Sequence, residues 1–240
     1  MNTKWIFCLL FLLMFSSIQA QDKMNEMSEQ KSSAQRWQIG IQGGTGYLLA
    51  NINDVEEDFS RKLKWGHHHS ADLHYMLNQQ RGIGIKYSGF YTSAGSYTII
   101  DIGDGLKNWC INMKKRIYTN FIGLSFRTQQ YFTRSDKFKI TSDIALGYAH
   151  YRDEEENDHI QLSNLLLKSG SPGINLELSI EYSLLSWVSI GATASCFGSW
   201  FWKGTFTDGY NSTTVKFKDA QMDNINASRL DLSLGVKIYF

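Results

Sequence analysis

The last twelve residues of the chain alternate strictly between apolar and polar side chains. In this segment, RLDLSLGVKIYF, the apolar positions are the even-numbered ones. They are Leu230, Leu232, Leu234, Val236, Ile238 and Phe240. A period of two residues is typical of a β-strand, because successive side chains of a strand lie on opposite faces. We therefore expect residues 229–240 to form a strand with one apolar and one polar face.

The same alternation recurs upstream and predicts seven further strands. Their segments begin RWQIGI, SADLHY, GIGIKY, IYTNFI, KFKITS, GINLEL and WVSIGA. Long and short connections follow one another in turn, and the long ones fall within 51–65, 94–115, 152–169 and 199–225. Eight antiparallel strands joined in this way form an up-and-down meander with all long loops at one end, which is typical of transmembrane barrels.

Alternation alone does not decide which face points inward, because a soluble lipocalin-like barrel has the same meander with an apolar interior. Side-chain size separates the two alternatives. The polar face is rich in glycine and serine, for example at Gly40, Gly123 and Ser233. An eight-stranded barrel has little interior space beyond its side chains, so small residues belong inside and the bulky apolar face belongs outside. The sequence predicts an all-β fold, an eight-stranded antiparallel up-and-down transmembrane β-barrel whose apolar face contacts lipid.

In that orientation, nine charged residues fall on the interior face. They are Asp72, Lys86, Arg127, Lys139, Asp143, Glu177, Glu181, Asp231 and Lys237. Isolated charges in a narrow interior are costly, so we expect these groups to pair with one another or with water. Five acidic and four basic residues nearly balance, which favours a plugged barrel over an open channel.

Aromatic residues cluster near the ends of the predicted strands, as they do in the two girdles of membrane barrels. We expect Trp37, Tyr131, Phe132, Trp187 and Phe240 toward the short turns, and Tyr47, Tyr91, Tyr148, Phe197 and Trp200 toward the long loops.

The amino-terminal segment has the pattern of a secretory signal peptide. Lys4 precedes an apolar run, 5–15, and small or polar residues end in Ala20, after which we expect cleavage. The run is shorter than the roughly 20 apolar residues that a membrane-spanning helix needs. We therefore predict a signal peptide at 1–20, a short polar segment at 21–35 and a barrel domain at 36–240. The net charge of +1 gives no indication of a nucleic-acid partner.

These features together resemble a known family. The ending LDLSLGVKIYF is similar to the carboxyl-terminal recognition signal of outer-membrane barrels, and GIGIKYSGFYTS and IALGYAHY resemble the variant common in Bacteroidota. The chain thus resembles small barrels of the OmpX or OmpA-transmembrane-domain type. The resemblance implies a monomer in the outer membrane, in contact with its lipid and lipopolysaccharide. It also implies insertion by the barrel-assembly machinery, which would recognise Leu234, Val236, Ile238 and Phe240.

Three functions are compatible with such a barrel, since one fold hosts many activities. The first is a non-enzymatic surface, structural or binding role through the loops, in which Trp200, Phe201 and Trp202 either contact a partner or pack within an extended hairpin. The second is a narrow passive pore for small solutes. The third is a lipid-modifying enzyme of the lipid A acyl hydrolase or transferase type.

The histidine cluster GHHHS is the most conspicuous candidate for chemistry. His67 and His69 share one strand face, but no carboxylate or cysteine stands at a spacing that would complete a metal site. His68, Ser70 and Asp72 share the other face and resemble the catalytic sets of some outer-membrane lipid A enzymes. Neighbours two apart on a strand are rather distant for the direct proton transfer that such a set requires.

Two further features carry less information. The acidic run RDEEEND at 152–158 lacks the glycine-punctuated spacing of a dedicated calcium loop. Cys110 and Cys196, the cysteines outside the predicted signal peptide, either pair or remain free thiols. We therefore expect no catalytic residue, no cofactor and no metal.

Overall fold

The computed structural model describes residues 36–49, 57–101, 108–131, 137–157, 165–208, 211–220 and 223–240. The predicted signal peptide, the segment 21–35 and Phe132 lie outside these residues. The described elements are β1 (Trp37–Leu48), α2 (Glu57–Leu63), β2 (Trp65–Met76), β3 (Arg81–Asp101), β4 (Asn108–Tyr131), β5 (Phe138–Asn157), β6 (Leu165–Leu185), β7 (Val188–Phe201), β8 (Lys203–Thr207), β9 (Ser212–Lys216), β10 (Ile225–Asn226) and β11 (Arg229–Tyr239). No helix among them is long and apolar enough to cross a membrane.

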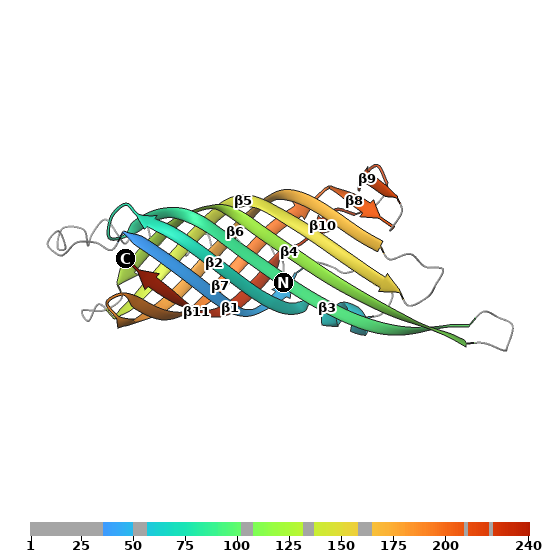
Figure 1. Ribbon diagram of the computed structural model, residues 1–240, viewed down its shortest axis with the longest axis horizontal. Helices are drawn as coiled ribbons and strands as arrows, with labels where there is room; N and C mark the ends of the chain where they lie inside the picture. Colours follow the sequence, from blue (N-terminus) through green and yellow to red (C-terminus); the bar gives the residue numbers. More distant parts are fainter. Residues whose placement is uncertain are drawn as a thin grey trace.

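Eight of these strands close into an antiparallel barrel (Figure 1). Strands β1 to β7 pair in chain order, and β11 pairs with both β7 and β1. In the closing pair, Ile39 lies opposite Ile238 and Gly43 lies opposite Leu234. The last strand thus completes the ring against the first, and the predicted fold class is confirmed.

The alternating pattern places apolar side chains outside and polar side chains inside. Leu124 on β4 is 75% exposed and Leu234 on β11 is 71% exposed, whereas Asp231 is buried. Small interior residues make room for the charged ones: a Cβ at Gly40 would lie 2.5 Å from Oδ1 of Asp72. The orientation expected from side-chain size is therefore the one that the structure adopts.

The predicted long connections contain more regular structure than expected. Residues 94–101 and 108–115 are the upper parts of β3 and β4, which stay paired as far as Asp101 and Asn108. Strands β5 and β6 likewise pair through 153–155 and 165–167. In Figure 1 the β3–β4 hairpin projects farthest from the barrel. The prediction of loops there was wrong, because antiparallel pairing continues beyond the apolar belt that guided the strand boundaries.

The other two long connections also contain secondary structure. The segment 51–65 includes α2, and 199–225 includes β8 and β9, which extend the sheet at the edge of β6. All of these additions lie at one end of the barrel, which we call the loop end. The opposite end, where the chain terminates, is the turn end (Figure 1).

Among the described residues, the aromatic girdles follow the predicted positions with one error. Trp37, Trp187 and Phe240 are exposed at the turn end, and Trp200 is exposed at the loop end. Phe197 was predicted in the outer girdle but is completely buried. The reason is strand parity: the even positions of β7 face outward, so an odd-numbered residue on that strand faces the interior.

Candidate functional site: the barrel interior

The barrel interior holds a charged network at the level of the apolar belt. All nine charged residues predicted for the interior are at most 5% exposed. A tenth, Arg229, was not predicted from the sequence and is also completely buried. With Arg229, five acidic residues face five basic ones, so the formal charges of this set cancel.

Arg127 is the centre of the largest group. Its Nε and terminal nitrogen donate to the two oxygens of Asp143 at 2.8 and 2.6 Å, in bidentate geometry. The same terminal nitrogen reaches Asp72 Oδ2 at 2.8 Å, and the other donates to Gln38 at 3.2 Å. One guanidinium therefore joins strands β1, β2, β4 and β5 across the barrel, as its planar fork allows.

Glu181 organises a second group nearer the turn end. It accepts hydrogen bonds from Lys237 at 2.5 Å and from the Tyr239 hydroxyl at 2.6 Å, and Lys139 lies 3.3 Å away. The Lys139 ammonium also lies 3.6 Å from the centre of the Tyr239 ring. Each charge therefore has a partner.

A third charged pair, Lys86 with Glu177, bridges β3 and β6. Both side chains are fully buried, so this contact also ties opposite walls of the barrel together.

Arg229 marks the upper boundary of the charged network. Its Nε donates to Asp231 at 3.0 Å, and a terminal nitrogen donates to Ser88 at 2.7 Å. Its guanidinium carbon also lies 4.3 Å from the ring centre of Phe197 and 5.4 Å from that of Phe90. The side chain thus faces carboxylate on one side and aromatic rings on the other.

An apolar core fills the loop end above Arg229. Its ring contacts include Phe121 with Phe197 at 5.6 Å and Tyr151 with Phe201 at 5.5 Å between centroids. Helix α2 adds Phe59 and Leu63, and the turn after β9 adds Phe217. The buried members of this core are Phe59, Leu63, Ala94, Ile117, Phe121, Ala145, Ala149, Tyr151, Phe197, Phe201, Phe217 and Ala227.

This core separates the three aromatic residues that the sequence offered either as loop contacts or as packing residues. Trp200 and Trp202 are 52% and 49% exposed, but Phe201 is fully buried. Alternation places Phe201 on the interior face, where it packs against Tyr151. Only the two tryptophans remain available to a partner.

The predicted set of His68, Ser70 and Asp72 is not assembled. His68 Nε2 lies 3.2 Å from the Ser88 hydroxyl and 3.7 Å from Asp231. The partners of His68 come from β3 and β11, so spacing along one strand could not identify them. Asp72 binds Arg127 of β4 and also His74, its neighbour two residues along on β2.

A different triplet has the geometry of a catalytic triad. His74 Nδ1 lies 3.0 Å from Asp72 Oδ2, and His74 Nε2 lies 3.0 Å from Ser125 Oγ. All three side chains are buried, and Arg127 occupies the same Asp72 oxygen. Because a nucleophile must reach its substrate, this arrangement serves the interior hydrogen-bond network. The pairing of His74 with Ser125 links β2 to β4, which no sequence spacing reveals.

The remaining candidates do not come together as sites. His69 lies on the outer face and contacts the Tyr87 hydroxyl at 3.4 Å. Glu154 and Glu156, from the acidic run, bind Arg116. Cys196 is a buried free thiol. Within the described residues, no group of three or more histidines, cysteines or acids could hold a metal ion.

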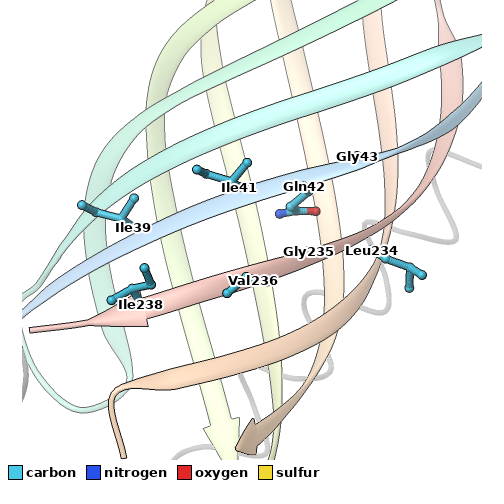
Figure 2. Close-up of a pocket in the computed structure, with 8 residues that line it drawn as sticks. All are labelled: Ile39, Ile41, Gln42, Gly43, Leu234, Gly235, Val236 and Ile238. Atoms are coloured by element: carbon cyan, nitrogen blue, oxygen red, sulfur yellow. The ribbon is translucent and has the colours of Figure 1, made fainter. Parts of the chain in front are cut away.

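Two hollows differ in place and size. A groove of about 570 Å³ lies on the outer surface at the β1–β11 seam (Figure 2). Its lining is Ile39, Ile41, Gln42, Gly43, Leu234, Gly235, Val236 and Ile238. An interior cavity beside Glu181 and Lys237 measures only about 10 Å³, enough for at most one water molecule. The larger hollow is therefore a groove in the apolar outer surface of the barrel, and the interior cavity is too small to hold a ligand.

Comparison with known proteins supports the fold. No protein-family model and no curated protein sequence matches the chain. Among solved structures, a major outer membrane protein from Thermus thermophilus is 12% identical, with 85% of this chain and 99% of that chain covered and a TM-score of 0.50. The outer membrane protein OprG from Pseudomonas aeruginosa is 13% identical, with 87% and 99% covered and a TM-score of 0.48. The outer membrane protease OmpT from Escherichia coli is 10% identical, with 88% and 99% covered and a TM-score of 0.46.

The closed ring, its apolar exterior and the first of these likenesses define the class. The chain is a small eight-stranded antiparallel β-barrel of the outer-membrane type. Identities this low show the fold alone, and because barrels of one architecture carry different activities, function has to be argued from the interior and the surface.

Proposed function

We propose that the protein is a non-enzymatic integral outer-membrane barrel that acts through its external surface, in a structural or binding role. The turn end lies toward the periplasm and the loop end lies outside the cell. This orientation follows from the short turns at one end and the long hairpins at the other. The apolar belt between the two aromatic girdles then contacts the lipid.

The burial of the interior charges carries this proposal. A water-filled pore would leave its charged lining accessible to solvent, yet none of the ten interior charges is more than 5% exposed. Above them, Phe121, Phe197 and Phe201 fill the cross-section at the loop end. Two successive plugs, one ionic and one aromatic, favour a closed barrel over the alternative of a narrow pore.

Planar-bilayer recording tests the closed state directly. We expect the refolded wild-type protein to show no stable conductance steps. Phe201→Ala alone should not open it, because the ionic network remains in place. A steady open conductance of the wild-type protein would contradict the proposal and favour the pore.

The same burial argues against a lipid-modifying enzyme. The Ser125 hydroxyl lies inside the ring of strands, whereas acyl chains lie outside it. Ser125→Ala should therefore leave the lipid A of producing cells unchanged when it is analysed by mass spectrometry. A change in acylation that requires both Ser125 and His74 would contradict the non-enzymatic role.

Assembly is a further part of the proposal. We infer that the barrel-assembly machinery recognises Leu234, Val236, Ile238 and Phe240, and that the barrel works as a monomer. In support, these side chains form one outward row at the end of the chain, on the strand that closes the ring. Phe240→Asp should lower the amount of heat-modifiable barrel in the outer membrane, while Asn78→Asp in the β2–β3 turn should not. Equal amounts for both variants would contradict the assignment.

A further inference from the structure

The small sheet formed by the upper part of β6 with β8 and β9 has two unlike faces. One face is apolar: Phe206 lies beside Phe217, with ring centroids 6.4 Å apart, and a Cβ at Gly204 would meet Leu167. The other face carries Lys168, Lys203 and Lys216, all exposed. Because the apolar face packs on the loop-end core, the lysine face points away from the barrel.

Two of these lysines stand directly opposite each other. Lys203 of β8 is the antiparallel partner of Lys216 of β9. Like charges in this position repel and destabilise a strand pair. No ion pair joins either lysine to an acidic group among the residues that the structure describes. An anion bound between the two ammonium groups would relieve the repulsion.

The next row of cross-strand partners on the same face adds a third charge and two hydroxyl groups. Lys168 of β6 pairs with Thr205 of β8, and Thr205 pairs with Thr214 of β9. The two threonine hydroxyls lie 2.9 Å apart. Lys168, Lys203, Lys216 and the two threonines therefore share one face within two successive rows, and we call them the lysine face. Ammonium and hydroxyl donors on one surface are the groups that bind phosphate oxygens.

The lysine face lies at the height of the lipid headgroups. Trp200, exposed at the end of β7, belongs to the outer aromatic girdle, and Trp202 follows it in the link to β8. Lys203 comes three residues after Trp200, which is about 10 Å along a strand and about 8 Å along the membrane normal at the usual tilt. A headgroup layer is about 5–8 Å thick, so the ammonium groups meet it where phosphates reside.

Charge on the neighbouring strands is arranged differently. On the outer face of β4 and β5, Arg116 binds Glu156 at 2.6 Å, and Arg152 pairs with Glu154. Those cations are already neutralised by the protein itself. The lysine face is therefore a local excess of positive charge, although the whole chain has a net charge of only +1.

We propose that the lysine face binds the phosphate groups of lipopolysaccharide in the outer leaflet. This inference rests on the proposed function, which places the loop end outside the cell. The ligand chemistry is a membrane-anchored sugar that carries phosphate monoesters. Lys203 and Lys216 hold one phosphate between them, while Lys168 and the threonines contact the adjacent sugar or a second phosphate. The two tryptophans lie against the headgroup boundary.

Binding of purified lipopolysaccharide to the folded protein in detergent micelles tests the proposal. The test variant is Lys203→Gln with Lys216→Gln, and the matched control is Arg81→Gln with Lys137→Gln, which removes the same charge at the turn end. We expect at least tenfold weaker binding for the test variant and less than twofold change for the control. Enzymatic removal of the phosphates from the lipopolysaccharide should abolish the difference between wild-type and test variant.

Stability without ligand gives a second readout that a merely structural role would not produce. Because the lysine pair repels itself, the test variant should unfold at the same or a higher urea concentration than the wild-type protein. Lys216→Glu, which places a carboxylate opposite Lys203, should raise stability further and also weaken binding.

Several results would overturn the inference. They are unchanged binding by the test variant, equal weakening by the control, equal affinity for dephosphorylated lipopolysaccharide, or tighter binding of a soluble polyanion such as heparin. If the test variant still assembles as a heat-modifiable barrel in the outer membrane, such a result leaves the proposed function standing. Failure of the wild-type protein to assemble there would instead overturn the proposed function.

Discussion

Strand β4 passes through two environments, and its polarity inverts between them. Near the turn end, Arg127 is buried inside the barrel and Leu124 is exposed outside. Near the loop end, Ile117 is buried inside, while Arg116 lies outside and binds Glu156. Tyr118 stands at the change, paired with Tyr91 of β3.

Strand β5 repeats the inversion beside it. Asp143 faces inward and Leu146 outward in the lower part, whereas Tyr151 faces inward and Arg152 outward above. The comparison shows that the medium outside each region of the barrel determines whether charged or apolar side chains fill its interior. Lipid cannot solvate a charge, so the lower region turns its charged groups inward and pairs them. Water solvates charges at the loop end, so there the hydrophobic effect fills the interior with apolar groups.

Among the variants that test this contrast, removal of Arg127 should cause the largest loss of stability. Arg127→Met leaves Asp72 and Asp143 buried without their cation, and breaking a buried ion pair costs about 3–5 kcal/mol. Urea unfolding of the refolded barrel in phospholipid vesicles measures the loss. The triple variant that also carries Asp72→Asn and Asp143→Asn should recover much of it. A loss below about 1 kcal/mol for the single variant would contradict a dry ionic interior.

Truncation of Phe201 tests the apolar region. Phe201→Ala opens a cavity in the loop-end core, and large-to-small changes of this kind cost about 3–5 kcal/mol. The neighbouring exposed residue gives the control, because Trp202→Ala should stay within about 0.5 kcal/mol. The same unfolding experiment compares them. Equal losses would show that Phe201 and Trp202 do not differ in burial as described.

A charge on the outer face of the lower region should have a smaller but clear effect. Leu234→Arg faces the lipid and should cost about 2–4 kcal/mol if it lies near the midplane. Ser233→Leu, its inward neighbour, overpacks the interior and should cost about 1–3 kcal/mol. Ser212→Arg, exposed at the loop end, serves as the control for water contact. A tolerated Leu234→Arg would argue that this face does not meet lipid.

The smallest effect belongs to the outer ion pairs of the loop end. Arg116→Met should cost only about 0.2–1 kcal/mol, because solvent screens the contact with Glu156. The effect should shrink further at high salt, unlike that of Arg127→Met. Unfolding curves at low and high ionic strength distinguish the two arginines. A salt-insensitive loss at Arg116 would indicate that the pair is buried by something outside the described residues.

The alternation of residues predicted the architecture because one strong constraint acts along the whole apolar belt. Each strand there has to present bulky apolar groups to lipid, so Leu124, Leu234 and their equivalents mark the register without ambiguity. Asp72, Arg127 and Glu181 then fall inside by parity alone. Contacts such as Arg127–Asp72 could not be predicted, because they join strands that are not adjacent. Arg127 and Asp143, by contrast, lie opposite each other on the adjacent strands β4 and β5.

Several errors of the sequence-based prediction lie where the outer surface of the barrel no longer has to present apolar groups to lipid. Above Tyr118 the outer face meets water, so apolar residues such as Phe197 and Phe201 belong to the interior. Phe197 was misplaced by a rule that puts apolar groups outside. His74 and Arg229 were overlooked although their parity is correct: His74 lies on the inward face of β2, and Arg229 begins β11. Helix α2 is seven residues long, too short to give a periodic signal.

A cysteine scan along β4 tests the inversion most directly. Single cysteines at the outward positions 114, 116, 118, 122, 124 and 126 would carry an environment-sensitive dye in lipid vesicles. The parent chain for the scan lacks residues 1–20 and carries Cys110→Ala and Cys196→Ala. Positions 122, 124 and 126 should report hydrocarbon and be quenched by lipid-borne quenchers, whereas 114 and 116 should report water. The inward positions 117, 121 and 127 should resist labelling. Lipid quenching that continues through 114, or that appears at the inward positions instead, would contradict an inversion of polarity along the strand.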